Sequence, residues 1–423
     1  EVLSVKLLSA ILNKKGILSK AVDSRNLIKT DSNFGEAIVL EDVSKENVKK
    51  HFANNGHALQ LVTGFIASNS KGETTTLGRG GSDFTASIYA AALNADELQI
   101  WTDVSGMFTA NPRVVKQAFP ISEISYEEAM ELSHFGAKVL YPPTIQPALR
   151  KEIPIRIKNT FDPKSSGTLI CKDPKNSNEV KGISHIEDIS LITLEGGGMI
   201  GIPGFSKRLF ETLSQQKINV VFITQASSEH SICFAIDEQF SDRIEDVIKD
   251  EFSDDFNVGN LQEIEIQNNA SVIAVVGSGM TGTKGIAAQF FRAITESEVN
   301  VMAIAQGSSE KNISAVVKTN DVSNAIHSMH QAFFDQSIDV NIGIIGYGNV
   351  GKEFFNQLQN QRKYLELDSD IRLNIIAVSN STKMVLKNNH IEANDLENLD
   401  TEQETNILNL IKEYYRKNQT TNV

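Results

Sequence analysis

The sequence is poor in cysteine and has no long apolar run. Its two cysteines, Cys171 and Cys233, are too few and too far apart in the sequence for a disulfide framework or a cysteine-based metal site. We therefore expect a reducing, cytoplasmic location and no resident metal ion. No apolar stretch approaches the roughly 18 residues of a membrane-spanning helix, and the first residues lack the order that marks a signal peptide.

Basic residues are fewer than acidic residues. The chain has 40 Lys and Arg and 53 Asp and Glu, which gives a formal net charge of −13. This charge argues against a surface for nucleic acid or an anionic membrane, but it is compatible with a local basic pocket for a small anion. The length of 423 residues predicts two to four domains, and a composition of 40% hydrophobic and 22% charged residues is ordinary for globular protein.

The strongest pattern that is present is an internal repeat. Residues 196–236 align without a gap on residues 277–317, at a constant offset of 81 positions. Each copy reads as a strand, a glycine turn and a helix with apolar residues at helical spacing, followed by two strands and a second amphipathic stretch. The repeat therefore predicts two consecutive βαββα(β) modules.

The pattern GxGxxG occurs three times, and a lone match is a weak signal. The three sets are Gly196/Gly198/Gly201, Gly277/Gly279/Gly282 and Gly346/Gly348/Gly351. The first two occupy equivalent repeat positions, so we interpret them as the strand-to-helix turn of the module, where glycine permits positive φ and close backbone approach. The third set follows an apolar run outside the repeat and is the candidate for a dinucleotide turn.

Polar, turn-rich stretches at 159–182 and 335–339 separate the repeats from their neighbours. The chain begins at Glu1, without Met and inside an expected helix, so we expect it to be cut at both ends. The expected divisions are 1–170, 183–266, 270–335 and 338–423.

In the first region, a polar glycine-rich turn leads into an alanine-rich helix at 74–96. Backbone N–H groups at this helix start, next to Arg79, suit a carboxylate or phosphate, and Asp83 suits an ammonium group. The alternative, weighed evenly, is a helix capped by Ser82 or Asp83. Further along, a strand ends at Thr102, where parallel α/β folds present ligands. The isolated Lys138 is either a phosphate-binding charge or a solvated surface residue.

Four stretches of this region together resemble the carboxyl-terminal part of the aspartokinase catalytic domain. They are "GFIASNSKGETTTLGRGGSDFTA", "WTDVSGMFTANPR", "FGAKVLYP" and "IPIRIKNTFDP", in order and at matching spacing. The paired repeats resemble tandem ACT modules, and the last region resembles the start of homoserine dehydrogenase. The resemblance implies an amino-acid-kinase-like α/β portion, two ACT-like βαββαβ modules and the beginning of a Rossmann fold, as in bifunctional aspartokinase/homoserine dehydrogenases.

The resemblance implies that ATP with Mg²⁺ phosphorylates the side-chain carboxylate of L-aspartate, with charge supplied by Arg79, Asp83 and Lys138. The residues implied at the amino-acid site are Glu1, Arg79, Ser82 and Asp83. Those implied around the nucleotide are Thr102, Asp103, Phe108, Arg113 and Lys138. This chain departs from the family pattern at Phe108, Asn111 and Tyr141, where Tyr, Asp and His are usual. It also lacks a counterpart of the family's "KFGGTS" start, so we expect no kinase activity from residues 1–423 alone.

Gln225 and Gln306 occupy identical places in the two repeats, each followed two residues later by Ser-Ser-Glu. Without the family, a polar turn residue is the preferred interpretation; the resemblance makes both residues candidate contacts for an inhibitory amino acid, with L-threonine expected. ACT modules commonly pair within or between chains, so we also expect a homo-oligomer.

The last region reads as strand, glycine turn, helix and strand. The turn needs one glycine for tightness, one for pyrophosphate approach and one for helix-strand contact. The implied cofactor-binding residues are Gly346, Gly348, Asn349, Val350 and Gly351. The second strand ends in Ser379-Asn380, without the acid that binds a ribose hydroxyl in NAD enzymes, so NADP is at least as compatible as NAD.

The sequence therefore supports two hypotheses of different classes. The first is a feedback-regulated aspartate kinase fused to homoserine dehydrogenase. The second is a non-catalytic amino-acid sensor, in which the ACT pair binds a ligand and the flanking regions are degenerate. Phosphorylation of aspartate by the complete chain distinguishes them.

Overall fold

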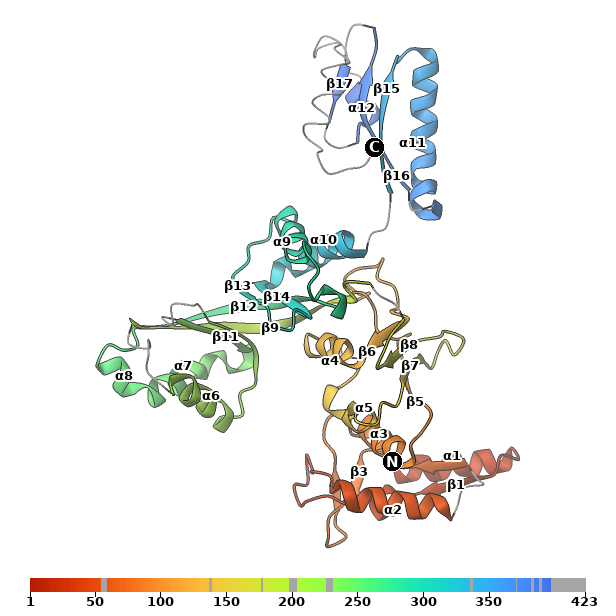
Figure 1. The fold of residues 1–423 in the computed structure, drawn as a ribbon, viewed down its shortest axis with the longest axis vertical. Coiled ribbons are helices and arrows are strands. Elements are labelled where there is room, and N and C mark those ends of the chain that lie inside the picture. The colour runs from red at the N-terminus through yellow and green to blue at the C-terminus, as the bar shows by residue number, and fades with distance from the viewer. Residues whose placement is uncertain are drawn as a thin grey trace. The chain divides into compact units, whose positions relative to one another are not determined.

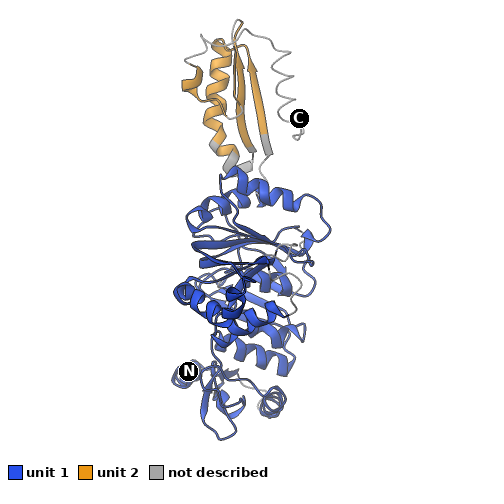
Figure 2. Cartoon of the chain, turned by 90° about the vertical axis from the view of Figure 1, so that its left-hand side faces the viewer, with its two compact units in different colours: residues 1–334 blue, residues 335–423 orange. Residues whose placement is uncertain are grey.

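The structure is a computed structural model that describes most of the chain. The described residues are 1–54, 59–136, 139–175, 178–197, 204–225, 231–334, 338–369, 371–381, 384–387 and 390–396. The chain divides into two compact units, Glu1–Phe334 and Asp335–Val423 (Figure 2). The element order confirms the expected α/β class. Within the described ranges, no helix is both long and apolar enough to cross a bilayer.

The first part of unit 1 is built from short strands and the helices that pack on them (Figure 1). Its strands form a parallel pair β1-β2, an antiparallel pair β3-β4 and a four-stranded sheet in the order β5-β7-β8-β6. The elements are α1 (Val2–Lys14), β1 (Ser19–Val22), α2 (Glu41–Ala53), β2 (Leu59–Val62), β3 (Ile66–Ser68), β4 (Thr74–Thr76), α3 (Gly81–Leu93), β5 (Leu98–Thr102), β6 (Glu123–Ser125), α4 (Tyr126–His134), η2 (Pro142–Ile145), α5 (Gln146–Leu149), β7 (Ile155–Asn159) and β8 (Thr168–Cys171).

The two repeats join in one six-stranded sheet with the order β10-β11-β9-β12-β14-β13. Helices α9 and α10 pack on the half of this sheet that the second repeat supplies, and α6 and α7 pack on the half that the first repeat supplies (Figure 1). The elements are β9 (Gly182–Glu195), α6 (Phe205–Gln215), β10 (Val220–Gln225), β11 (Ser231–Asp237), α7 (Ser241–Glu251), α8 (Ser253–Asn257), β12 (Glu263–Val276), η5 (Ser278–Met280), α9 (Ile286–Glu296), β13 (Ala303–Ala305), β14 (Asn312–Lys318) and α10 (Val322–Phe334).

Each of the long strands β9 and β12 serves both modules. Residues 191–195 of β9 pair with 263–267 of β12, and residues 182–186 pair with 272–276. Between these halves, Asp188 and Asn269 adopt left-handed φ angles of 58° and 55°, which are uncommon for residues with a side chain. These two residues are separated by the repeat offset, so both copies change direction at the same place. The sequence did not establish which segment forms the last strand of each module. In the structure, residues 263–267 of β12 are this strand for the first module, and residues 182–186 of β9 are this strand for the second.

The second repeat packs directly on the first part of unit 1. Val272 and Ala274 of β12 belong to the same buried cluster as Ile124 and Leu132, which come from β6 and α4. On its other face the second repeat buries the helix residues Phe290 and Ile294, as their helical spacing predicts. A module that was predicted as a separate domain therefore shares a hydrophobic core with the region before it.

Unit 2 begins as a βαβ arrangement. β15 (Ile338–Ile345) and β16 (Ile371–Ser379) are parallel neighbours, and α11 (Asn349–Ser369) connects them. β17 (Met384–Leu386) pairs antiparallel with β16, and α12 (Ala393–Leu396) follows. The strand, turn, helix and strand expected from the sequence are all confirmed.

Candidate active site and regulatory sites

Helix α3 begins at a glycine turn and has no side-chain cap. Gly80 is the N-cap residue, with a left-handed φ of 67°, and no side chain makes a capping hydrogen bond. Ser82 and Asp83 lie in the first turn instead, so the alternative that either residue caps the helix is wrong. The positive end of the helix dipole is therefore not neutralised by a cap, which suits a small anion. Burial raises the pKa of the Asp83 carboxyl, which lies in the same turn.

The glycine turn before α3 is held by the segment that follows α4. A Cβ at Gly80 would lie 2.8 Å from Thr144 Cγ2 and 3.2 Å from Tyr141 Cβ, and the left-handed φ of 67° favours glycine there as well. The Arg79 guanidinium stacks over the Tyr141 ring at 5.3 Å from its centroid, a cation–π contact. From the sequence, Tyr141 was recognised only as a departure from the family pattern, and its contact with Arg79 was not predicted. Its place in the "FGAKVLYP" stretch could have indicated that it lies near the site.

The residues implied at the nucleotide follow the carboxyl end of β5. The Thr102 hydroxyl donates to Asp103 Oδ1 at 3.1 Å, and Asp103 is exposed. Phe108 is half-buried and bridges to Pro120. Arg113 is exposed, and its backbone N–H donates to Asn111 Oδ1 at 3.0 Å. These side chains border solvent, so a ligand can reach them.

Glu1 is not bonded to the other residues that were expected at the amino-acid site. Glu1 is the exposed N-cap of α1. In the part of the chain that the structure describes, no hydrogen bond or ion pair connects its carboxylate with Arg79 or Asp83. Lys138 lies outside the described residues.

The two candidate effector residues lie at equivalent strand ends. Gln225 is the last residue of β10, and Gln306 directly follows β13; both are exposed. In the second repeat, the Glu310 carboxylate accepts the Gly282 backbone N–H at 2.7 Å. This contact joins the Ser-Ser-Glu stretch to the glycine turn and closes a loop next to Gln306. The corresponding residues 198–203 and 226–230 of the first repeat lie outside the described residues.

The glycine turn of unit 2 has room where a pyrophosphate would approach. Gly346 has a left-handed φ of 98°. A Cβ at Gly348 would meet nothing within 4 Å, whereas a Cβ at Gly351 would lie 2.2 Å from Gly346 O. Helix α11 begins at Asn349, and Val350 is 85% exposed. This open helix N-terminus fits a dinucleotide pyrophosphate.

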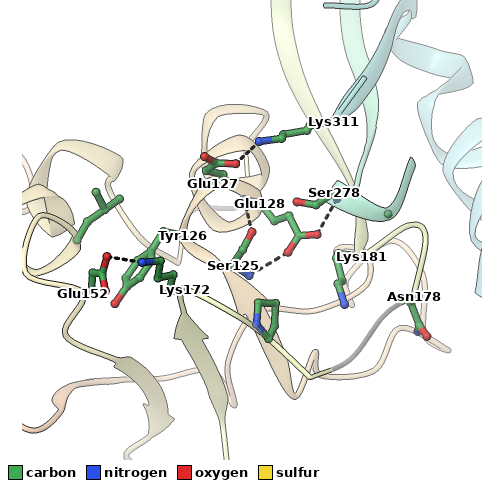
Figure 3. A pocket seen from close by; sticks show the side chains of 13 residues that line it. Ser125, Tyr126, Glu127, Glu128, Glu152, Lys172, Asn178, Lys181, Ser278 and Lys311 are labelled. Carbon is green, nitrogen blue, oxygen red and sulfur yellow. Dashed lines mark hydrogen bonds and ion pairs between the residues drawn. The ribbon is translucent and has the colours of Figure 1, made fainter. Parts of the chain in front are cut away.

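A cavity of about 590 Å³ lies where the start of α4 meets the glycine turn of the second repeat (Figure 3). Two ion pairs line it: Lys172 with Glu152 at 2.6 Å, and Lys311 of the second repeat with Glu127. Glu128, which is 1% exposed, and the buried Lys181 also line it. Sequence reasoning did not single out any of these residues, because they come from four separate segments.

Comparison with known proteins agrees with these features. An amino acid kinase family model matches residues 1–159, and an ACT domain model matches residues 192–252 and 273–333. The crystal structure of E. coli aspartokinase III in complex with aspartate and ADP (R-state) superimposes with a TM-score of 0.67 and 31% identity, covering 79% of this chain and 74% of that one. The chain belongs to the aspartokinase family.

Other members of the aspartokinase family extend the comparison. E. coli aspartokinase III in complex with lysine and aspartate (T-state) gives a TM-score of 0.66 at 30% identity, covering 79% of this chain and 74% of that one. The bifunctional aspartokinase/homoserine dehydrogenase 2, chloroplastic, of Arabidopsis thaliana is 37% identical over 400 residues. That match covers 91% of this chain but 43% of the Arabidopsis protein, so the chain spans less than half the length of this relative.

Proposed function

We propose that this chain belongs to a feedback-regulated aspartate kinase fused to homoserine dehydrogenase. The observation that carries the proposal is the uncapped start of α3, flanked by Arg79 and Asp83, in a chain of the aspartokinase family. In the proposed reaction, the side-chain carboxylate of L-aspartate attacks the γ-phosphorus of ATP, ADP leaves, and 4-phospho-L-aspartate forms. Magnesium is proposed to arrive with the nucleotide.

The proposed roles follow from charge and position. The Arg79 guanidinium binds a carboxylate of aspartate, and the first turn of α3 at Ser82 contributes backbone N–H donors. Asp83 pairs with the substrate ammonium group. Arg79 is oriented by its contact with Tyr141 at 5.3 Å, so less side-chain freedom is lost on binding. Phosphoryl transfer of this kind depends on positioning and charge neutralisation, which is consistent with a site without a covalent nucleophile.

The proposed nucleotide site lies beside Thr102, Asp103, Phe108 and Arg113, at the carboxyl end of β5. Their exposure and their place at a parallel strand end support it. Lys138, which follows α4 in the sequence, is assigned to the phosphates by its motif position alone. Glu1 is assigned to the amino-acid site by its motif position alone.

The regulatory proposal is that the ACT modules, at 183–266 and 270–335, bind an inhibitory amino acid. Aspartokinase III has been crystallised with lysine, which supports an amino-acid effector for this chain as well. Gln225 and Gln306 would contact it, and L-threonine is the proposed ligand. Calorimetric titration with both amino acids is the test: heat from L-lysine but none from L-threonine would contradict the threonine assignment.

Residues 338–423 are proposed to begin the dinucleotide-binding domain of homoserine dehydrogenase. Gly346, Gly348, Asn349, Val350 and Gly351 would hold the pyrophosphate of NADP or NAD, and the reduced form of that cofactor would supply the hydride for reduction of aspartate semialdehyde to homoserine. The open space at Gly348 supports this assignment. A homo-oligomer formed through the ACT modules is proposed on the same family basis.

The deciding experiment uses the full-length gene product with ATP, Mg²⁺ and L-aspartate. We expect ADP release that requires aspartate, together with an acyl phosphate that hydroxylamine traps. The Asp83→Asn variant should lose most of this activity, and the Asp96→Asn variant, changed at an exposed-loop carboxylate beyond the end of α3, should retain it. Amino-acid binding without any aspartate-dependent ADP release would favour the non-catalytic sensor instead.

A further inference from the structure

Helix α4 is fixed at its start by a buried carboxylate that reaches the second repeat. Glu128 Oε1 accepts the backbone N–H of Ser278 at 2.7 Å, and Oε2 accepts the backbone N–H of Ser125 at 2.9 Å (Figure 3). The second of these bonds belongs to a capping box at the start of α4. One side chain therefore both caps α4 and holds the glycine turn at 277–282.

The end of α4 is fixed by the same sheet. The Ser184 hydroxyl, on the half of β9 that completes the second module, donates to Phe135 O at 2.8 Å and to Leu132 O at 3.2 Å. Gly136 has a φ of 108°, and a Cβ there would lie 2.0 Å from His185 O. Close backbone packing and hydrogen bonds thus hold both ends of α4 against the second repeat, so α4 follows any movement of that module.

The turn held by Glu128 is continuous with the candidate effector loop. Ser278 lies four residues before Gly282, whose N–H is bound by Glu310 at 2.7 Å. Lys311, which follows Glu310, bonds to both elements. Its backbone oxygen accepts the Gly277 N–H at 2.9 Å, and its side chain pairs with Glu127 of α4. A ligand that rearranges this loop therefore acts on the Ser278 N–H that the buried Glu128 carboxylate accepts.

Helix α4 also contacts the segment that holds the aspartate-site turn. Gln146, directly after η2, donates from its side-chain amide to Met130 Sδ of α4 at 3.4 Å, and Leu140 and Ile145 belong to the same buried cluster as Leu132. The same segment carries Tyr141, which stacks on Arg79. Thr144, one turn further, contacts the backbone at Gly80, as the 2.8 Å approach to a Cβ shows. A series of contacts therefore connects α4 with Arg79 through the segment 141–146.

We propose that Glu128 is a positioning residue through which the second repeat sets the geometry of the Arg79 turn. This inference rests on the proposed function, because it assigns aspartate to that turn. Close-packed interfaces switch between discrete arrangements rather than deforming gradually, so a small shift at Ser278 is passed through α4 to Tyr141. Releasing the Glu128 contact should weaken aspartate binding and reduce the response to an effector together.

The test compares Glu128→Gln with Glu127→Gln in the full-length gene product. Glutamine keeps the size of Glu128 but replaces one accepting oxygen by an NH₂ group that cannot accept the Ser278 or Ser125 N–H. We expect the KM for aspartate and the half-inhibitory concentration of L-threonine each to rise at least about five-fold, the lower end of typical coupling factors. The KM for ATP should stay within two-fold. Glu127→Gln should change neither value, because its ion pair with Lys311 is exposed.

A second variant guards against a folding defect at position 128. Ser184→Ala removes the hydroxyl at the other end of α4 and should raise the same two values. If both variants lower only the thermal unfolding midpoint while the kinetic values stay at wild type, Glu128 is merely structural and the inference is wrong. A wild-type protein without aspartate-dependent ADP release overturns the proposed function instead, so the two failures are distinct.

Discussion

The Thr109 hydroxyl and His330 Nε2 lie 2.9 Å apart, although 221 positions separate them in the sequence. Both residues are buried, with 2% and 6% of their surface exposed. Thr109 Oγ1 also accepts the backbone N–H of Phe119 at 3.3 Å, and the Phe119 ring meets Phe334 edge-on at 6.1 Å. The loop after β5 is thereby bonded to α10, the last helix of the second repeat.

We predict that Thr109→Val lowers the free energy of unfolding of unit 1 by about 1–3 kcal/mol, because it leaves the buried His330 Nε2 without its hydrogen-bond partner. Urea unfolding followed by circular dichroism measures this change. Thr295→Val is the matched control, since its hydroxyl is exposed on α9, and it should stay within about 0.5 kcal/mol of wild type. Equal stability of the two variants would show that the Thr109 contact contributes nothing.

Arg79→Lys should raise the KM for aspartate by about ten-fold or more, because a charged hydrogen bond contributes roughly 1.5–3 kcal/mol and lysine provides neither the planar fork nor the stacking on Tyr141. Steady-state kinetics of the full-length gene product provide the measurement. Arg150→Lys is the control: that arginine also pairs with a carboxylate, Glu41, but at an exposed position. A KM that is unchanged by Arg79→Lys would remove Arg79 from the aspartate site.

Two alanine substitutions in the unit 2 turn should have opposite effects. Gly348→Ala adds a methyl group into open space, so the fold should persist while NADPH binding is lost, because that space is assigned to the pyrophosphate. Gly351→Ala places a Cβ 2.2 Å from Gly346 O and should destabilise the turn itself. Fluorescence titration with NADPH and thermal unfolding separate the two. Tight NADPH binding by Gly348→Ala would contradict the dinucleotide assignment.

The contribution of Glu128 to stability should depend on pH. Burial alone raises the pKa of this carboxyl, but the N–H donors of Ser278 and Ser125, with the charge of Lys181, more than offset it, so the pKa lies below its ordinary value of 4.5. A lowered carboxyl pKa adds stability above pH 4.5 that is lost as the pH falls through the folded-state pKa. The stability difference between wild type and Glu128→Gln should therefore shrink on acidification. A difference that is constant in urea unfolding from pH 7 to pH 3 would contradict this.

Gln306 should contribute to effector binding, because it directly follows β13 beside the loop that the contact of Glu310 with Gly282 closes. Gln306→Ala should then weaken L-threonine binding in calorimetry by about ten-fold, as expected for loss of a hydrogen bond of roughly 1.5 kcal/mol. Gln239→Ala, changed at an exposed turn residue outside both strand ends, should bind as wild type does. Unchanged binding by Gln306→Ala would assign the effector elsewhere.

The sequence by itself determined the local elements and the repeat. Apolar spacing predicted a helix in the second repeat, and an apolar run before the third glycine pattern predicted a strand; the structure has them as α9 (Ile286–Glu296) and β15 (Ile338–Ile345). Such elements show in the sequence because a helix buries one face at a regular spacing of residues. The offset of 81 positions reappears in the left-handed residues Asp188 and Asn269. It also separated the third glycine pattern from the two that belong to the modules.

Only the tertiary structure decided which segments touch. The sharing of β9 and β12 between modules, the stacking of Tyr141 on Arg79, and the Glu128 contact with Ser278 join residues that are tens to hundreds of positions apart. The choice between Gly80 and Ser82 or Asp83 as the helix cap also depended on the packing of Tyr141 and Thr144 around the turn. Periodicity records which face of an element is buried, but it carries no information on what that face is buried against.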